Sequence, residues 1–93
     1  MSVVVQFKPV SVTRTMYDEV IRRVDGEAGG FPPEGQEYHV CFGPEDDVQV
    51  TEVWVTRERF EEFGKHLHPI LADVGITFSG PPDIFEVYNH SGA

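Results

Sequence analysis

The chain has 93 residues, 40% of them hydrophobic and 12% aromatic, a composition that excludes disorder and fits one domain over residues 1–93. Sixteen acidic residues against seven basic ones give a formal net charge of −9, which argues against nucleic acid and membrane surfaces as partners. A single cysteine, Cys41, excludes an internal disulfide, and the longest apolar run, Val3–Val5, is too short to span a membrane, so we expect a cytoplasmic protein.

The first half of the chain predicts a strand, a helix and a long loop. Ser2–Lys8 is rich in β-branched and aromatic residues and ends at Pro9, which is typical of a strand and its exit. Thr13 or Thr15 then caps a helix, whose apolar side chains repeat with the helical period: Met16, Tyr17, Val20, Ile21 and Val24. Asp25–Gly35 holds four glycines and two prolines in eleven residues, which indicates a loop. Loops of this length are typically either mobile or part of a binding-site rim.

The second half of the chain predicts a hairpin and a second helix. Gln36–Gly43 and Asp47–Val55 are predicted strands, joined by a turn at Pro44–Asp46. Thr56 caps the helix that follows, whose apolar stripe is Phe60, Phe63, Leu67, Ile70, Leu71 and Val74.

The end of the second helix and the last strand follow from residues that break or favour regular structure. Pro69 removes a hydrogen bond inside the helix, so we expect a kink or a restart near His68. Gly75 ends the helix, a loop runs through residues 80–82, and Ile84–Tyr88 forms the final strand.

The order strand, helix, strand, strand, helix, strand predicts the ferredoxin-like α+β fold. Two right-handed crossovers give a four-stranded antiparallel sheet with both helices on one face. The predicted strands carry apolar residues on both of their sides: Val3, Val5 and Phe7 face opposite to Val4, and Phe85 and Val87 face opposite to Ile84 and Tyr88. We therefore expect a second copy of the chain to cover the free face, giving a homodimer.

The junction at residues 53–63 resembles a motif of the dimeric α/β-barrel superfamily, which includes the antibiotic-biosynthesis monooxygenases. Its sequence VWVTRERFEEF is similar to the motif V-W-x-S/T-x-E-x-F-x-x-F, and the order of elements matches over the whole chain. The resemblance implies sheets of two protomers facing each other. It does not select an activity, because the superfamily includes cofactor-independent oxygenases of aromatic polyketides, haem-degrading enzymes and lactone isomerases. The haem-degrading members use an Asn in the first strand and a Trp in the second helix, where this chain has Gln6 and Phe63.

The hairpin register predicts a candidate site on one face of the sheet. If the turn sets Gly43 opposite Val48, His39 faces Glu52, and both share a face with Trp54. A carboxylate can fix the tautomer of a histidine and raise its basicity, so His39 is a candidate catalytic base with Glu52 as its orienting partner. Trp54 offers a flat wall for an aromatic ligand. The alternative is a structural ion pair beside a core tryptophan.

Further ligand-binding candidates come from the two helices and the last strand. Tyr17 and Tyr88 can each place a hydroxyl in a pocket, Phe63 belongs to the apolar stripe, and His66 lies one residue away from it. His66 and His68 point about 200° apart on a helix, so they do not grip one ion. We expect no metal and no cofactor.

The sequence leaves three functions open. The first is a homodimer that binds a small apolar or aromatic molecule between sheet and helices. The second is a cofactor-independent monooxygenase or isomerase acting on an aromatic or polyketide-like substrate, with His39 as base. The third is a structural or interaction module without catalysis.

Overall fold

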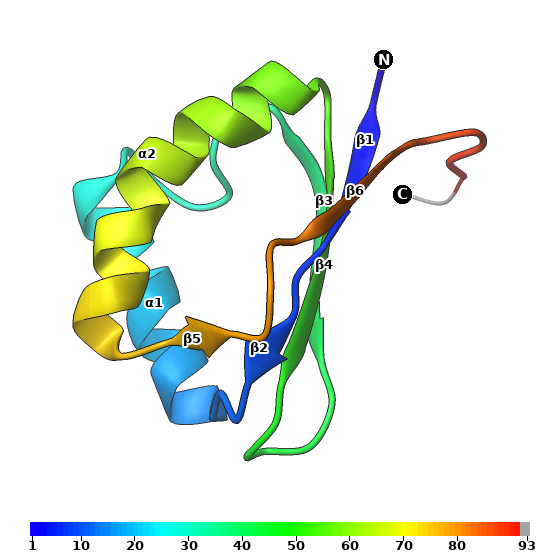
Figure 1. Cartoon of the computed structure of the whole chain (residues 1–93). Coiled ribbons are helices and arrows are strands. Elements are labelled where there is room, and N and C mark those ends of the chain that lie inside the picture. Colours follow the sequence, from blue (N-terminus) through cyan, green and yellow to red (C-terminus); the bar gives the residue numbers. More distant parts are fainter. Residues whose placement is uncertain (92–93) are drawn as a thin grey trace.

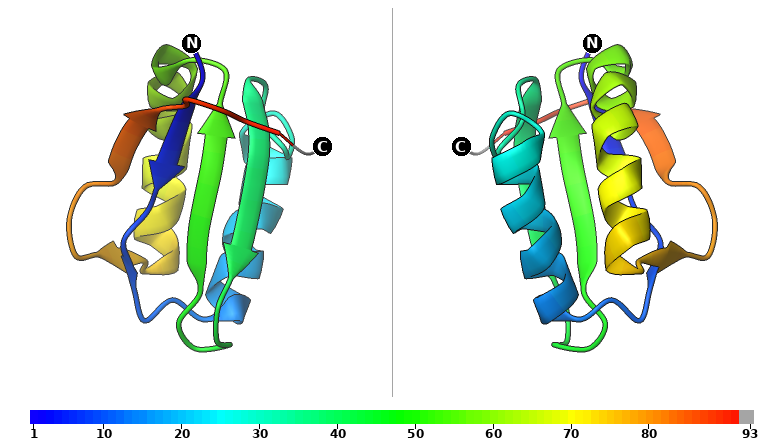
Figure 2. Two further views of the ribbon diagram at one scale, coloured as in Figure 1. Left: turned by 90° about the vertical axis from the view of Figure 1, so that its right-hand side faces the viewer. Right: turned by 90° about the vertical axis from the view of Figure 1, so that its left-hand side faces the viewer.

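The computed structural model describes residues 1–91 and has the predicted α+β architecture (Figure 1). Its elements are β1 (Val3–Gln6), β2 (Pro9–Val10), α1 (Arg14–Glu27), β3 (Gln36–Phe42), β4 (Gln49–Trp54), α2 (Arg57–Val74), β5 (Thr77–Phe78) and β6 (Asp83–Glu86). The main sheet is antiparallel with strand order β3-β4-β1-β6, and β2 and β5 form a separate two-stranded ribbon. Both helices cover one face of the main sheet (Figure 2), as the ferredoxin-like fold requires.

Both helices begin at threonine caps. The Thr13 hydroxyl accepts a hydrogen bond of 3.1 Å from the amide of Met16, and the Thr56 hydroxyl accepts one of 3.1 Å from the amide of Arg59. Each cap satisfies an amide that has no partner within the first helical turn. Gly75 ends α2 with φ at +88°, a left-handed conformation that glycine adopts without strain. These predicted boundaries are confirmed.

The predicted restart of the second helix near Pro69 does not occur. α2 continues without interruption from Arg57 to Val74 with Pro69 inside it. Pro69 is exposed, so water can reach the carbonyl that loses its hydrogen bond one turn earlier. The helix curves as it crosses the sheet (Figure 1).

The short ribbon of β2 and β5 was not predicted from the sequence. Pro9, expected to end the first strand, instead opens β2 and lies opposite Phe78 of β5. Proline fits here because an edge position does not require its missing amide hydrogen. Helix α1 also extends three residues into the predicted loop, to Glu27, and the last strand ends at Glu86 rather than at Tyr88.

The hydrophobic core lies between the sheet and the helices. We call the helix-covered side of the sheet the inner face and the opposite side the outer face. On the inner face Val3, Val5 and Trp54 form a buried cluster, packed against Phe60, Phe63 and other partly buried aromatic and aliphatic side chains. A second cluster joins the helices through Val20, Val24 and Ile70.

The outer face is also apolar, as the sequence predicts. Tyr38 and Phe42 of β3 and Phe85 of β6 are 42%, 48% and 62% exposed. After β6 the chain crosses one end of this face (Figure 2), and the ring of His90 lies 6.4 Å from that of Tyr38. The protein therefore presents exposed aromatic rings on the side of the sheet that no helix covers.

Candidate functional site

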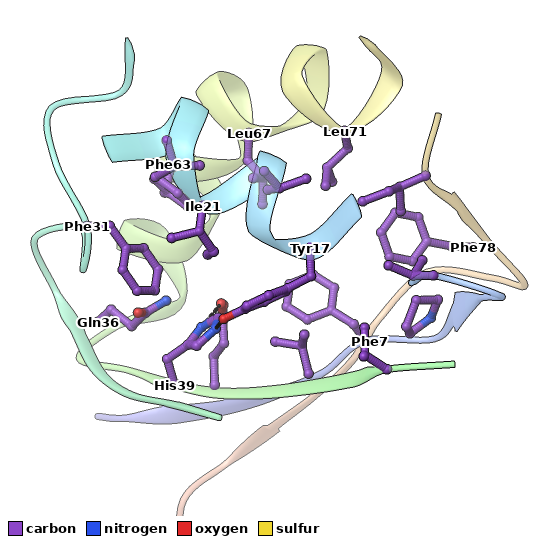
Figure 3. Close-up of a pocket in the computed structure, with 18 residues that line it drawn as sticks. Phe7, Tyr17, Ile21, Phe31, Gln36, His39, Phe63, Leu67, Leu71 and Phe78 are labelled. Carbon is purple, nitrogen blue, oxygen red and sulfur yellow. Dashed lines mark hydrogen bonds and ion pairs between the residues drawn. The ribbon is translucent and has the colours of Figure 1, made fainter. Parts of the chain in front are cut away.

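A cavity with a volume of about 80 Å³ lies between the two helices and the inner face of the sheet. Its walls come from α1, α2, β3, β4 and the β2–β5 ribbon, and Phe31 adds a wall from the loop that follows α1 (Figure 3). Most of the lining side chains are aliphatic or aromatic. Among the residues that the structure describes, the polar side chains in the lining are those of Tyr17, Gln36, His39 and Glu52. Phe31 is the cavity-lining residue from the predicted loop, and the role of this loop as a binding-site rim stays a prediction.

A chain of hydrogen bonds runs from the cavity into the core. The Tyr17 hydroxyl lies 2.6 Å from Nε2 of His39, and Nδ1 of His39 lies 2.8 Å from Oε2 of Glu52. The indole Nε1–H of Trp54 donates to the other carboxylate oxygen, Oε1, at 2.9 Å. Each Glu52 oxygen thus has a partner, which a carboxylate that is only 5% exposed requires.

The direction of these bonds fixes the proton positions on His39. A carboxylate only accepts hydrogen bonds, so Nδ1 of His39 carries the proton that it donates to Glu52. In the neutral ring Nε2 then has a free lone pair, which accepts the hydroxyl proton of Tyr17. The basic nitrogen of His39 therefore points at the cavity wall formed by Tyr17.

Tyr17 remains a hydrogen-bond donor over the whole physiological pH range. Burial above all, and after it the nearby negative charges of Cys41 as its thiolate, Glu52 and Asp18, raise the pKa of Tyr17 to about 12. A phenolate in this position would also be repelled by the Glu52 carboxylate.

Two aromatic rings hold the imidazole of His39 in place. The Tyr17 ring is stacked on it at a centroid distance of 5.9 Å, and the Phe31 ring meets it edge-on at 5.1 Å. The amide of Phe31 donates to Oδ1 of Asp25 at 3.1 Å, which ties this part of the loop to the end of α1. The packing leaves the His39 side chain 14% exposed.

Gln36 contributes a polar group that no other protein group satisfies. Both Nε2 and Oε1 of its amide are buried, and neither has a hydrogen-bond partner within the described part of the chain. Figure 3 shows this side chain between Phe31 and His39. Buried amides without partners are rare in folded proteins, because desolvation costs free energy that a hydrogen bond normally offsets.

The structure confirms the predicted register between the two hairpin strands. His39 is opposite Glu52 and Cys41 is opposite Val50. His39, Glu52, Tyr17 and Phe63, all predicted site residues, line the same cavity.

The other three predicted ligand-binding residues lie outside the cavity lining. Trp54 is fully buried beneath it and contacts the site through Glu52. His66 is on the exposed side of α2, and Tyr88 is fully exposed beyond the end of β6. Direct contact of these three side chains with a ligand stays a prediction.

Sequence analysis missed Gln36 and Phe31. Gln36 and His39 are three residues apart, a spacing that puts side chains on opposite faces of a regular strand. An irregularity between Gln36 and Tyr38 shifts the register, so that Gln36 is opposite Trp54 and shares the inner face with His39. Nothing in the sequence marks this bulge. Phe31 had a weak signal, since it is the aromatic residue within the predicted loop.

Residues 1–91 contain neither a membrane-spanning helix nor a cluster of metal ligands. In this range no helix combines the length and the apolar character needed to cross a membrane. The same residues contain no group of three or more His, Cys, Asp or Glu side chains placed to hold a metal ion.

Comparison with known proteins shows the fold. No protein-family model and no curated protein matches the chain. A candidate antibiotic biosynthesis monooxygenase from Chloroflexus aurantiacus J-10-fl matches with a TM-score of 0.63 at 13% identity, over 98% of this chain and 95% of that one. Rv0793 from Mycobacterium tuberculosis matches with a TM-score of 0.54 at 14% identity, over 99% and 96%. A second candidate monooxygenase of the same name, from Caulobacter crescentus CB15, gives 0.55 at 15% identity, over 97% and 89%.

These structures place the chain in a fold class. It has the ferredoxin-like fold of the antibiotic biosynthesis monooxygenase-like proteins, and the likeness extends over nearly the whole chain. The ferredoxin-like fold of the single chain, which the junction motif implied, is therefore confirmed. At these identities the likeness does not carry an activity to this chain.

Proposed function

We propose that the protein binds a small apolar or aromatic molecule in the cavity between its sheet and its helices, and that it does so as a homodimer. The observation that carries the proposal is the composition of the cavity wall. Aliphatic and aromatic side chains form most of it, and the few polar side chains come from α1, β3 and β4: Tyr17, Gln36, His39 and Glu52. An apolar cavity with a few converging polar groups is the usual form of a small-molecule site.

The homodimer part of the proposal rests on the outer face of the sheet. Tyr38, Phe42 and Phe85 are large apolar side chains with about half of their surface in water. Exposed aromatic residues on one side of a small domain favour a symmetric dimer, because a second copy offers the same apolar surface. Sedimentation at micromolar concentration tests this part, and a monomer there would contradict it.

The binding proposal is tested by filling the cavity. Ile21 of α1 lines the cavity, whereas its neighbour Arg22 is exposed. We expect wild type to bind 1-naphthol, Ile21→Trp to weaken binding by about tenfold or more, and Arg22→Trp to bind like wild type. Calorimetric titration measures all three. If wild type and Ile21→Trp bind 1-naphthol with equal affinity, the ligand does not bind in the cavity.

A second candidate function, cofactor-independent oxygenation, is favoured by the His39–Glu52 pair. In this reaction a phenol or enol takes the place of the Tyr17 hydroxyl at Nε2 of His39, Nε2 accepts its proton, and Glu52 stabilises the resulting imidazolium. The substrate anion then supplies the electrons that reduce O2, so that conversion of a CH2 group to C=O consumes one O2 and releases one water. The names of two structural neighbours point to the same chemistry.

An oxygen electrode tests this second function. We expect wild type to consume O2 with an oxidisable anthrone and His39→Ala to lose about a hundredfold or more of the rate, as general-base catalysis typically contributes. The matched control is His68→Ala, at an exposed position of α2 that is absent from the cavity lining. Equal rates for wild type and His39→Ala would exclude His39 as the base while leaving the binding proposal in place.

A further inference from the structure

The buried amide of Gln36 identifies the polar group that a ligand must carry. Gln36 lines the cavity, the Nε2 and Oε1 atoms of its amide are both buried, and neither meets a partner within residues 1–91. The other polar groups of the wall are already paired, since Tyr17 bonds to His39 and His39 bonds to Glu52. Gln36 is thus the polar wall residue whose hydrogen-bonding capacity the fold leaves unused.

We propose that Gln36 anchors the ligand of this cavity and selects a neutral molecule with a lactam or carboxamide edge. A glutamine amide presents one acceptor and two donors in one plane. A lactam presents N–H and C=O side by side, so it can donate to Oε1 and accept from Nε2 of Gln36 at once. A ketone, an ether or an amine can satisfy only one of the two atoms. This inference rests on the proposed binding function.

The charged side chains in the cavity lining favour a ligand with a neutral head group. Among the described residues that line the cavity there is no lysine or arginine, and the lining includes the buried carboxylate of Glu52. A carboxylate or phosphate ligand would lose its hydration without gaining a cation, and it would be repelled by Glu52. Carboxylic acids match the geometry of Gln36 but ionise at neutral pH. The lactam or carboxamide edge has the geometry without the charge.

The neighbours of Gln36 indicate what adjoins this edge. Figure 3 shows the amide beside the rings of Phe31 and His39, and these rings meet edge-on at 5.1 Å. Aromatic walls favour a planar ring fused to the polar edge. The ligand class is therefore a small aromatic lactam or an aryl carboxamide.

The test compares three probes of nearly the same size by calorimetric titration of the full chain. 2-Quinolone has both the N–H and the C=O, 1-methyl-2-quinolone lacks the donor, and quinoline has only an acceptor. We expect wild type to prefer 2-quinolone by about tenfold over each of the others, the effect of one net hydrogen bond in a buried site. Gln36→Leu and Gln36→Met should bind the three probes with equal affinity.

A matched control makes the same change outside the cavity. Gln49 lies in β4 and is absent from the cavity lining, so Gln49→Leu should keep the wild-type preference. If wild type binds all three probes equally while Ile21→Trp weakens each of them, the role of Gln36 is overturned and the binding function stands. If wild type binds none of the probes, the binding function itself is overturned.

Discussion

The space between the sheet and the helices has a filled end and a hollow end, built from the same elements. At the filled end Trp54 is fully buried, and its ring lies 5.8 Å from that of Phe60 and 5.4 Å from that of Phe63. At the hollow end Tyr17, His39 and Gln36 surround the cavity. Large rings from both layers meet at the first end, whereas the side chains at the second end leave a cavity of about 80 Å³. Glu52 connects the two ends, because one of its oxygens faces Trp54 and the other faces His39.

Truncating the filled end should have the largest effect on stability. Trp54→Ala removes a fully buried ring and leaves Oε1 of Glu52 without its donor, so we expect a loss of about 3–5 kcal/mol in the free energy of unfolding. Leu71→Ala at the hollow end should cost about 2 kcal/mol, because part of that side chain already faces the cavity. Urea denaturation measures both. Equal losses would mean that the two ends are packed alike.

Removing the connection between the ends should have the next largest effect. Glu52→Leu leaves the Trp54 indole and Nδ1 of His39 without an acceptor, at about 1–3 kcal/mol for each unsatisfied donor. Glu52→Gln keeps an acceptor for Trp54 and should cost less than Glu52→Leu. Urea denaturation at pH 7 gives the comparison. A loss for Glu52→Leu no greater than that for the exposed Glu58→Leu would show that the chain of hydrogen bonds does not stabilise the fold.

The filled end could be predicted from sequence more completely than the hollow end. The helical stripe through Phe60 and Phe63 and the strand containing Trp54 have the regular periodicity of packed elements, so their contacts follow from the order of elements. His39 and Glu52 could also be paired, because the two-strand register follows from the length of the turn. Each of these inferences depends on a regular repeat of side chains along a helix or a strand.

The hollow end depends on features that have no period. The bulge at the start of β3 turns Gln36 onto the inner face, and two-residue strands are too short to leave a pattern that predicts the ribbon beside the cavity. Whether side chains fill a space or leave it open is decided by their volumes and rotamers in three dimensions. The sequence therefore predicted which residues face the helices and offered a cavity between sheet and helices as one hypothesis, but it did not determine whether that space is open.

Tyr17 allows the hollow end to be examined by titration. Tyr17→Phe removes the hydroxyl bound to Nε2 of His39 and should cost about 1 kcal/mol at pH 7. Burial raises the pKa of Tyr17 from its usual value of 10.0 to about 12. Folding favours the neutral phenol of Tyr17. Its contribution to the free energy of unfolding is therefore complete below pH 10 and is lost as the pH rises towards 12.

Absorbance at alkaline pH measures this directly. We expect an ionisation step near pH 12 in the folded wild type, and Tyr17→Phe should remove it. Tyr88→Phe, at a fully exposed position, should leave this late step in place. Absence of the late step from the folded wild type would contradict the buried, hydrogen-bonded position of Tyr17.

The smallest predicted effect has the opposite sign and separates a binding residue from a structural one. Gln36→Leu replaces a buried amide that no protein group satisfies by an apolar group of similar size, so we expect a gain of about 1 kcal/mol in the free energy of unfolding. Gln6→Leu should instead lower the free energy of unfolding. The side-chain carbonyl of Gln6 accepts a hydrogen bond of 2.6 Å from the Thr51 hydroxyl, and the substitution removes this bond. Urea denaturation without ligand measures both. If Gln36→Leu is more stable and no longer distinguishes the three probes, Gln36 serves binding rather than folding. If Gln36→Leu is less stable, the Gln36 amide supports the fold.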